Sequence, residues 1–370
     1  CEVADRLRSV ASRGCTIARL GGDEFAILLT SADKPSVAEA LAQSIIQAIE
    51  RPFLINDHHI VIGASIGIAI APYDGVSAEA LMRNADIALY RAKSDGRGLA
   101  QRFLPGMDEL ILARRQLELD LRRAIAVGEF ELFYQPLMNL KTQSIQSCEA
   151  LIRWNHPVRG LVAPNDFIPF AEETGLIVEI GEWTMVEACK EAMNWPSHIN
   201  VAINISPSQF IAKGLVAAVK YAVKKSGIDP TRIELEITET VLISDTDRAL
   251  TTLHELHALG VRIAMDDFGT GYSSLSYLRR FPFDKLKIDR SFINDIAHDR
   301  EAGAIVRAII QLANTLGMAT TAEGVEDSDQ KDILDALNCL EAQGFLIGRP
   351  MPRERLKTLL AAPMKPAAVA

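Results

Sequence analysis

The stretch that decides the fold is Arg232–Asp267, RIELEITETVLISDTDRALTTLHELHALGVRIAMDD. Two β-runs, RIELEIT and VRIAMDD, lie on either side of a helical pattern that ends at Gly260. A glycine suits a helix end because it adopts a left-handed backbone conformation without a steric penalty. This order of strand, helix and strand predicts an α/β fold.

The same order extends over the chain from about residue 130 onward. Apolar helical stretches separate most of its β-runs, and glycines such as Gly227 and Gly317 stand where these helices should end. The β-runs are ELFYQPL (131–137), QSCEALIRW (146–154), INVAINIS (199–206), RIELEIT (232–238), VRIAMDD (261–267), DKLKID (284–289), ATTAEGV (319–325) and EAQGFLI (341–347). Eight β-runs, mostly separated by helices, favour a TIM-like (β/α)8 barrel over an open sheet.

Polar residues interrupt these otherwise apolar strands, each in or at the end of a different strand except for two adjacent aspartates. They are Glu149, Asn204, Glu236, Asp266, Asp267, Lys287, Glu323 and Gln343. A polar side chain in an apolar strand is costly unless a partner compensates it. Active sites of barrels assemble at the carboxyl ends of the strands. The pattern therefore predicts one site at that rim.

The residue types at this rim favour hard divalent cations. Carboxylate and amide oxygens suit Mg²⁺ or Mn²⁺, whereas zinc is disfavoured because no His or Cys falls at a strand end. The adjacent Asp266 and Asp267 can bend toward one site at a strand end and bridge two ions, which clamp the oxygens of a phosphoryl transfer. Lys287 would contact a phosphate or orient the attacking water, and Glu323 would take part in proton transfer or hold metal-bound water. The alternative is a barrel whose ion pairs only support its structure.

The first 102 residues have a different pattern. The β-runs TIARL and FAILLT flank the turn GGDE (21–24), which predicts a β-hairpin, and helices are expected over 37–50 and 77–96. A β-run is expected over 58–71. Met107–Val127 has a helical pattern and predicts a linking helix. We therefore divide the chain into a first domain (1–102), a linker helix (103–127), a barrel (128–362) and a tail (363–370).

Composition narrows the class of protein. Of the 370 residues, 48% are hydrophobic and 24% are charged, which is ordinary for a globular protein and excludes a disordered or fibrous chain. The formal net charge of −9 argues against bulk nucleic acid or anionic lipid as partners. Five scattered cysteines without a CxxC pair predict free thiols and a cytoplasmic location. No membrane-spanning segment is visible, and the start at Cys1 suggests a fragment, so an anchor ahead of these residues stays open.

Seven ordered motifs resemble the EAL family of cyclic di-GMP phosphodiesterases over about residues 110 to 360. They are EALIRW (149–154), INIS (203–206), EITE (236–239), DDFGTGYSSL (266–275), KIDRSFI (287–293), AEGVE (322–326) and QGFLIGRP (343–350). The resemblance implies hydrolysis of cyclic di-GMP to linear pGpG with two Mg²⁺ or Mn²⁺ ions. Two departures, Leu340 after Cys339 and QGF in place of QGY, remove no metal ligand.

The resemblance also implies a role for each matching residue. Glu149, Asn204, Glu236, Asp266 and Asp267 would bind the metal ions, with Glu149 also counted among the catalytic residues. Lys287 and Glu323 would act at the water and the scissile phosphate. Gln343 would complete this network beside the substrate. Arg153 and Leu151 would contact the substrate, and Glu239 would stabilise the DDFGTG loop.

The string RLGGDEF (19–25), together with SIGIAIAPYDG and ADIALYRAKSDGRG, resembles the GGDEF family of diguanylate cyclases over about residues 1 to 102. The matching nucleotide- and metal-binding positions are Gly21, Gly22, Asp23, Glu24, Lys93 and Arg97. The family's first strand, with a metal-binding aspartate, does not occur in this sequence. Ser12 and Cys15 replace the Arg and Asp of the family's RxxD product site.

These resemblances set the remaining expectations. The partners would be cyclic di-GMP, GTP at the GGDEF domain and a second copy of the chain in a homodimer. The DDFGTG loop would be coupled to the dimer interface. The GGDEF domain would be a cyclase or a GTP sensor in a longer protein, or a scaffold that only aids dimerisation. The alternative for the barrel is a receptor that binds cyclic di-GMP without cleaving it.

Overall fold

The computed structural model describes residues 2–11, 14–30, 35–55, 58–60, 62–96, 98–212, 214–239, 241, 246–269, 278 and 280–361. The chain divides into two compact units, Cys1–Leu117 and Glu118–Ala370. The predicted tail, 363–370, lies outside the described residues. In the described part of the chain, no helix is long and apolar enough to cross a membrane.

The described part of the N-terminal unit contains short strands, three helices and the first half of a fourth. Its elements are α1 (Glu2–Val10), β1 (Cys15–Gly21), β2 (Glu24–Leu29), α2 (Pro35–Glu50), β3 (Phe53–Ile55), β4 (His58–Ile60), β5 (Ile66–Ile68), α3 (Ala78–Ser94), β6 (Ala100–Arg102) and the first half of α4 (Met107–Val127). The β-run expected over 58–71 is divided into the two strands β4 and β5. Leu7, Ile45, Ile49 and Phe53 form a small core, over which α1 packs on α2.

The hairpin predicted around GGDE is present. β1 and β2 pair antiparallel, with Gly21 opposite Glu24, and the turn places Gly22 at a φ of 49°, in the left-handed region that glycine tolerates. The boundary between the two compact units falls inside α4, at Leu117 and Glu118, so the barrel unit includes the second half of the helix predicted as a linker.

The C-terminal unit is the predicted (β/α)8 barrel. The closed sheet consists of β7 (Phe130–Asn139), β8 (Ser144–His156), β10 (Asn200–Ile205), β11 (Ile233–Thr238), β12 (Arg262–Phe268), β13 (Lys285–Ile288), β14 (Ala319–Ala322) and β15 (Glu341–Gln343), and β7 also pairs with β8. Two short strands extend it, β9 (Gly160–Val162) on β8 and β16 (Met351–Pro352) on β7.

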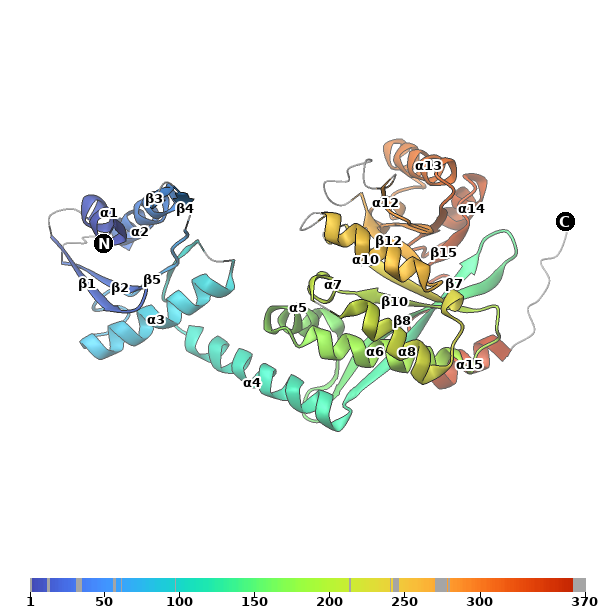
Figure 1. The fold of residues 1–370 in the computed structure, drawn as a ribbon, viewed down its shortest axis with the longest axis horizontal. Helices are drawn as coiled ribbons and strands as arrows, with labels where there is room; N and C mark the ends of the chain where they lie inside the picture. The colour runs from blue at the N-terminus through green and yellow to red at the C-terminus, as the bar shows by residue number, and fades with distance from the viewer. Residues whose placement is uncertain are drawn as a thin grey trace. The chain divides into compact units, whose positions relative to one another are not determined.

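Helices lie on the outside of these strands, as Figure 1 shows for α6, α8, α10, α13 and α14. The helical elements are α5 (Pro164–Thr174), α6 (Ile177–Ala192), α7 (Pro207–Ile211), α8 (Leu215–Ser226), the 3₁₀ turn η1 (Pro230–Arg232), α10 (Thr246–Ala258), α12 (Arg290–Ile293), α13 (Arg300–Thr315), α14 (Ser328–Ala336) and α15 (Arg353–Ala361). A large apolar core, which includes Ile203, Leu235, Ile263 and Leu286, joins the strands to the helices.

The barrel departs from the simple alternation in one strand. β7 runs antiparallel to both of its neighbours, β8 and β15, whereas the seven other barrel strands run parallel. A long hairpin joins β7 to β8 and pairs Phe130 with Trp154 at one end and Asn139 with Ser144 at the other. No helix separates these two strands, so the sequence rhythm of strand and helix begins only after β8.

Candidate active site

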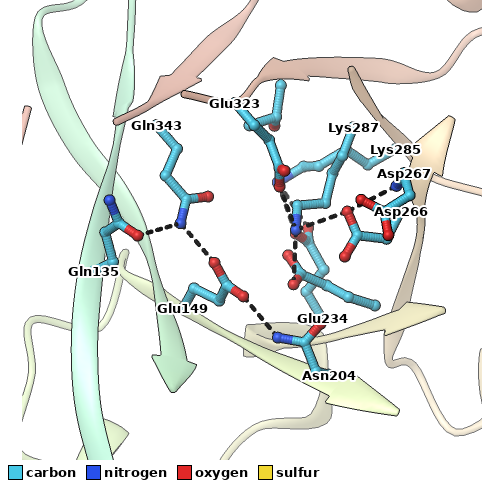
Figure 2. A network of polar contacts seen from close by, with 12 residues as sticks. Gln135, Glu149, Asn204, Glu234, Asp266, Asp267, Lys285, Lys287, Glu323 and Gln343 are labelled. Carbon is cyan, nitrogen blue, oxygen red and sulfur yellow. Dashed lines mark hydrogen bonds and ion pairs between the residues drawn. The ribbon is translucent and has the colours of Figure 1, made fainter. Parts of the chain in front are cut away.

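The polar residues predicted for the rim meet at one place. Figure 2 shows the side chains of Glu149, Asn204, Asp266, Lys287, Glu323 and Gln343 converging from six strands or strand ends. They lie close together because parallel strands with the same register end at the same edge, as in the pairing of Asn204 with Glu236. The structure therefore brings the predicted carboxylates, amides and lysine into one polar network.

Lys287 is the centre of this network. Its ammonium nitrogen Nζ lies 2.9 Å from a Glu236 oxygen, 3.0 Å from Asp266 Oδ1 and 2.6 Å from Glu323 Oε1. Only 1% of the residue is exposed. Burial by itself lowers the pKa of Lys287, but the charges of Glu236 and Glu323 outweigh burial and raise this pKa well above its ordinary value. The lysine is therefore a fixed positive charge.

Two of the carboxylates around Lys287, Glu236 and Glu323, are held in an environment that disfavours their charge. Burial raises the pKa of Glu236 well above its ordinary value, although the charge of Lys287 opposes this effect. Burial also raises the pKa of Glu323 to about 7, again against the lowering effect of Lys287. A carboxylate with such a pKa exchanges protons near neutral pH, which suits a proton-transfer role.

Glu149 is held from two sides. Asn204 Nδ2 donates to Glu149 Oε1 at 2.6 Å, and Gln343 Nε2 donates to Glu149 Oε2 at 2.5 Å. Glu149 is buried on β8, whereas Asn204 on β10 is exposed. Two amide donors fix the plane of the carboxylate, so its oxygens keep one direction in the site.

The adjacent aspartates turn toward the same region. Asp267 has a φ of 53°, a left-handed conformation that breaks the alternation of the strand, and its backbone N–H donates to Asp266 Oδ1 at 3.0 Å. Burial, followed by the charge of Asp266, raises the pKa of Asp267. Oxygen atoms of Asp266, Asp267 and Glu323 lie within 4.8 Å of one another.

The donor set fits a hard divalent cation. All the charged ligand atoms are carboxylate oxygens, which is the chemistry that Mg²⁺ and Mn²⁺ prefer. Glu236 Oε1 is buried and has no hydrogen-bond partner among the described residues. A buried carboxylate oxygen without a partner is costly, and a bound cation would remove that cost.

The other predicted barrel residues, Arg153, Leu151 and Glu239, lie outside the polar network around Lys287 and Glu149. Arg153 and Leu151 lie further along β8 and are half-buried. Arg153 donates to the carbonyl of Ile152 at 2.8 Å, and its guanidinium lies 5.4 Å from the ring centroid of Phe133. Burial lowers the pKa of Arg153, and the charge of Glu149 opposes this effect. Glu239 is buried directly after β11, and residues 270 and 271 of the DDFGTG loop, which it was predicted to stabilise, lie outside the described residues.

Five of the predicted nucleotide-binding residues of the N-terminal unit are described, and all five are solvent-exposed. Gly21, Gly22, Asp23 and Glu24 form the tip of the hairpin, where Arg19 Nε donates to the carbonyl of Gly22 at 3.0 Å. Lys93 is exposed in the last turn of α3. The predicted Arg97 lies outside the described residues.

Sequence reasoning missed a second charged layer inside the barrel. Lys285 Nζ lies 2.8 Å from Glu234 and 2.7 Å from Glu341, whose Oε2 also accepts from Thr321 Oγ1 at 3.0 Å. Lys285, Glu234 and Glu341 lie two positions before Lys287, Glu236 and Gln343. Because side chains two apart in a strand face the same side, this spacing was a usable signal.

Gln135 was missed as well. It is buried on β7, and its Oε1 accepts from Gln343 Nε2 at 3.1 Å (Figure 2). Its signal was a single amide within the apolar run ELFYQPL.

The fold and the site together define an α/β barrel protein whose carboxylates, amides and one lysine meet at the carboxyl ends of the strands. The family model of the EAL domain matches residues 118–350, and that of the diguanylate cyclase GGDEF domain matches residues 1–99. The chain belongs to the EAL family and carries GGDEF-family sequence ahead of the barrel.

Curated relatives and solved structures agree with this assignment. The chain is 45% identical over 97% of its length to the bifunctional diguanylate cyclase/cyclic di-GMP phosphodiesterase MucR of Pseudomonas aeruginosa, and it covers 53% of that protein. It is 37% identical over 95% of its length to the cyclic di-GMP phosphodiesterase PdeR of Escherichia coli, and again covers 53%. The chain thus spans about half the length of these relatives.

A solved structure of the MucR phosphodiesterase in complex with cyclic di-GMP matches the fold. It covers 65% of this chain and 99% of its own, with a TM-score of 0.63 and 47% sequence identity.

Proposed function

We propose that the barrel hydrolyses one phosphodiester bond of cyclic di-GMP and releases linear pGpG, with two Mg²⁺ or Mn²⁺ ions as cofactors. The observation that carries this proposal is the cluster of Glu236, Asp266 and Glu323 around Lys287, together with Glu149 held by Asn204 and Gln343, at the strand ends of an EAL-family barrel. The similarity to phosphodiesterases named for cyclic di-GMP supports the choice of substrate.

The two ions would be held by Glu149, Asn204, Glu236, Asp266 and Asp267. When bound, the ions would supply Lewis-acid activation of water and neutralise charge on the phosphate. Asn204 and Gln343 keep the Glu149 carboxylate in a fixed plane in advance of binding.

Lys287 and Glu323 would act on the reacting groups themselves. Lys287 carries a permanent positive charge within the network, so it would stabilise negative charge that develops on the phosphate oxygens. Glu323, with its pKa of about 7, would hold or release a proton at its Oε1 as water attacks the phosphorus atom. Arg153, further along β8, would contact a phosphate of the substrate.

The direct test is a turnover assay. Purified protein is incubated with cyclic di-GMP and Mg²⁺ or Mn²⁺, and linear pGpG is measured by chromatography, with EDTA as the metal-free control. We expect pGpG only with metal. Tight binding of cyclic di-GMP without turnover and without bound metal would instead identify a receptor, and folded protein that forms no pGpG at high concentration would refute hydrolysis.

For the N-terminal unit we propose that, in the full-length protein, it is either a cyclase or a GTP sensor that tunes the barrel. The exposed hairpin tip, Gly21–Glu24, would approach a nucleotide through its glycine backbone, and Asp23 and Glu24 would hold its metal ion. The test is to add GTP to the full-length protein. Cyclic di-GMP formation identifies a cyclase, and a changed rate of cyclic di-GMP hydrolysis identifies a sensor. If GTP changes neither and Asp23→Ala has no effect, the unit is a scaffold.

We also propose that the protein works as a homodimer whose stability affects hydrolysis. The support is the family resemblance alone, which links the loop after Asp267 to dimerisation. Sedimentation at a series of dilutions, with specific activity measured in parallel, tests it. Equal activity in demonstrated monomers would refute the link.

A further inference from the structure

A line of hydrogen bonds connects the reversed strand β7 to the proposed metal ligand Glu149. Gln135 Nε2 donates to the carbonyl of Gly348 at 3.0 Å, and Gln135 Oε1 accepts from Gln343 Nε2 at 3.1 Å. The same Gln343 Nε2 donates to Glu149 Oε2 at 2.5 Å. Gln135 and Gln343 are both buried, so water does not compete freely for these contacts.

The backbone carbonyl of Gly348 determines how the side-chain amides of Gln135 and Gln343 are oriented. A backbone carbonyl can only accept a hydrogen bond, so Gly348 requires the NH₂ end of Gln135. The oxygen of Gln135 therefore faces Gln343 and requires the NH₂ end of that residue. The opposite orientation of Gln343 would place its oxygen against two acceptors, Gln135 Oε1 and Glu149 Oε2, and is excluded.

The carbonyl of Gly348 is itself held in place. A Cβ atom at Gly348 would lie 2.7 Å from Cγ of Pro136, so the backbone packs directly against β7 beside Gln135. Gly344, next to Gln343, is equally close to its neighbour, because a Cβ there would lie 2.1 Å from the carbonyl oxygen of Val325. The N–H of Gly348 donates to the carbonyl of Gly344 at 3.0 Å, which closes the turn between the two glycines.

With its nitrogen held by Gln135 and Glu149, Gln343 presents its side-chain oxygen as a hydrogen-bond acceptor in the site. Gln343 Oε1 is buried and has no hydrogen-bond partner among the described residues. In Figure 2 the nitrogen of Gln343 faces Gln135 and Glu149, and its oxygen faces the other way, toward the side of Glu323 and Lys287. A buried acceptor without a partner is costly, so its orientation has to be imposed by the contacts of the nitrogen.

We propose that Gln135 is a positioning residue that acts through Gln343. It holds the Gln343 amide so that the nitrogen keeps the Glu149 carboxylate in its metal-binding plane and the oxygen is presented to a hydrogen-bond donor, a water molecule in the site. This role rests on the proposed metal-dependent hydrolysis. Residues that orient metal ligands change metal affinity or activity by about 10- to 100-fold when they are replaced.

The test uses the full chain and a double-mutant cycle. Gln135→Met keeps the length and volume of the side chain but removes both hydrogen bonds. Mn²⁺ affinity is measured without substrate, by electron paramagnetic resonance of free Mn²⁺, together with kcat and KM for cyclic di-GMP. We expect about 10-fold weaker Mn²⁺ binding and a lower kcat for Gln135→Met. On a Gln343→Ala background the same substitution should change Mn²⁺ affinity by less than about twofold.

The matched control is Gln330→Met. Gln330 is equally buried and donates to the carbonyl of Ile293, but it caps α14. This variant should lose stability without a change in Mn²⁺ affinity.

Three results would overturn the proposal: wild-type affinity in Gln135→Met, additive effects of the two substitutions, or a wild-type protein that binds no Mn²⁺. If the effects of the two substitutions on Mn²⁺ affinity are non-additive but the protein does not hydrolyse cyclic di-GMP, the proposed function is refuted and the effect of Gln135 on Mn²⁺ binding still holds.

Discussion

Lys285 and Lys287 are two positions apart in β13, so their side chains lie on the same face of the strand. Each places its ammonium group between carboxylates from other parts of the barrel. Lys285 lies 2.8 Å from Glu234 and 2.7 Å from Glu341, and Lys287 lies 2.6 Å from Glu323. The barrel interior thus holds two charged layers, one around Lys285 and one around Lys287. Only the layer around Lys287 contains proposed metal ligands. The two lysines form a natural pair for separating stability from metal chemistry.

Replacement of either lysine by methionine should destabilise the barrel. Each change leaves buried carboxylates without their cation, which costs about 3–5 kcal/mol in the free energy of unfolding. Mn²⁺ should restore most of this loss in Lys287→Met, because the ion replaces the missing charge, and little of it in Lys285→Met. Urea unfolding with Mn²⁺ and with EDTA measures both effects. Equal rescue of the two variants would contradict the placement of the metal site.

Glu149→Ala should abolish hydrolysis and keep the fold. The substitution removes a proposed metal ligand. Of its two partners, Asn204 is exposed and can turn to water, and Gln343 keeps its hydrogen bond to Gln135. We expect at least about a 100-fold fall in kcat/KM, with circular dichroism and the thermal midpoint close to those of the wild type. Near-normal turnover would contradict the assignment of Glu149.

The stability of the metal-free protein should depend on pH through Glu323. Its pKa in the folded protein, about 7, is above its value in an unfolded chain. The folded state therefore binds the proton more tightly, and this contribution is fully present below about pH 4.3 and is lost as the pH rises through about 7. Glu323→Gln should remove this part of the pH dependence in denaturant titrations with EDTA between pH 5 and 8. An unchanged slope in the variant would assign the effect to another group.

Mn²⁺ affinity should also depend on pH through Glu323, but in the opposite direction to stability. Because the Glu323 carboxyl beside the proposed metal site has to lose its proton when the ion binds, Mn²⁺ affinity should rise between about pH 6 and 8, and binding should release protons. Calorimetric titration in two buffers of different ionisation enthalpy measures the number released. Binding without proton release at pH 6 would show that Glu323 is already ionised.

The end of α4 should be firmly attached to β8 through a buried pair. His156 Nδ1 accepts from the backbone N–H groups of Val158 and Arg159, both at 3.1 Å, so Nε2 carries the proton and donates to Asp120 at 3.2 Å. Asp120→Ala leaves this buried donor without its acceptor and should cost about 1–3 kcal/mol.

The control for that variant is Asp247→Ala. Asp247 pairs with Arg280 at the surface, where its side chain is 91% exposed, so its loss should cost less than about 1 kcal/mol. Equal costs for the two aspartates would mean that the pair with His156 does not hold the helix.

The N-terminal unit can be tested at a single glycine. A Cβ atom at Gly67 would lie 1.9 Å from the carbonyl oxygen of Ala85, because β5 packs directly on the backbone of α3. Gly67→Ala should therefore unfold or strongly destabilise this unit, while Gly63→Ala, which meets nothing within 4 Å, should not. Limited proteolysis followed by mass spectrometry distinguishes the two, and similar patterns for both variants would contradict this packing.

Much of the fold and the site follows from local sequence, and the exceptions have physical reasons. The strands were predictable because they are apolar runs bounded by helices, and the site residues because a carboxylate such as Glu236 stands out in such a run. The reversal of β7 was missed, although residues 138–145 between the first two β-runs are too few for the crossover that a parallel pair of strands requires. Gln135 was missed because a single amide in an apolar strand is often only a structural polar group. Its contact with Gln343, which relates it to the site, is visible only in the structure.

The reversal of β7 has a consequence for how the barrel is joined to the rest of the chain. With all eight strands parallel, the segment ahead of the first strand would arrive at the floor of the barrel, opposite the acidic cluster. Here Phe130, the first residue of β7, pairs with Trp154 beyond Arg153 on β8, and the carbonyl of Glu129 accepts from Asn155 at 2.8 Å. The segment ahead of β7 therefore joins the barrel at the same end as the proposed site, and not at the opposite end.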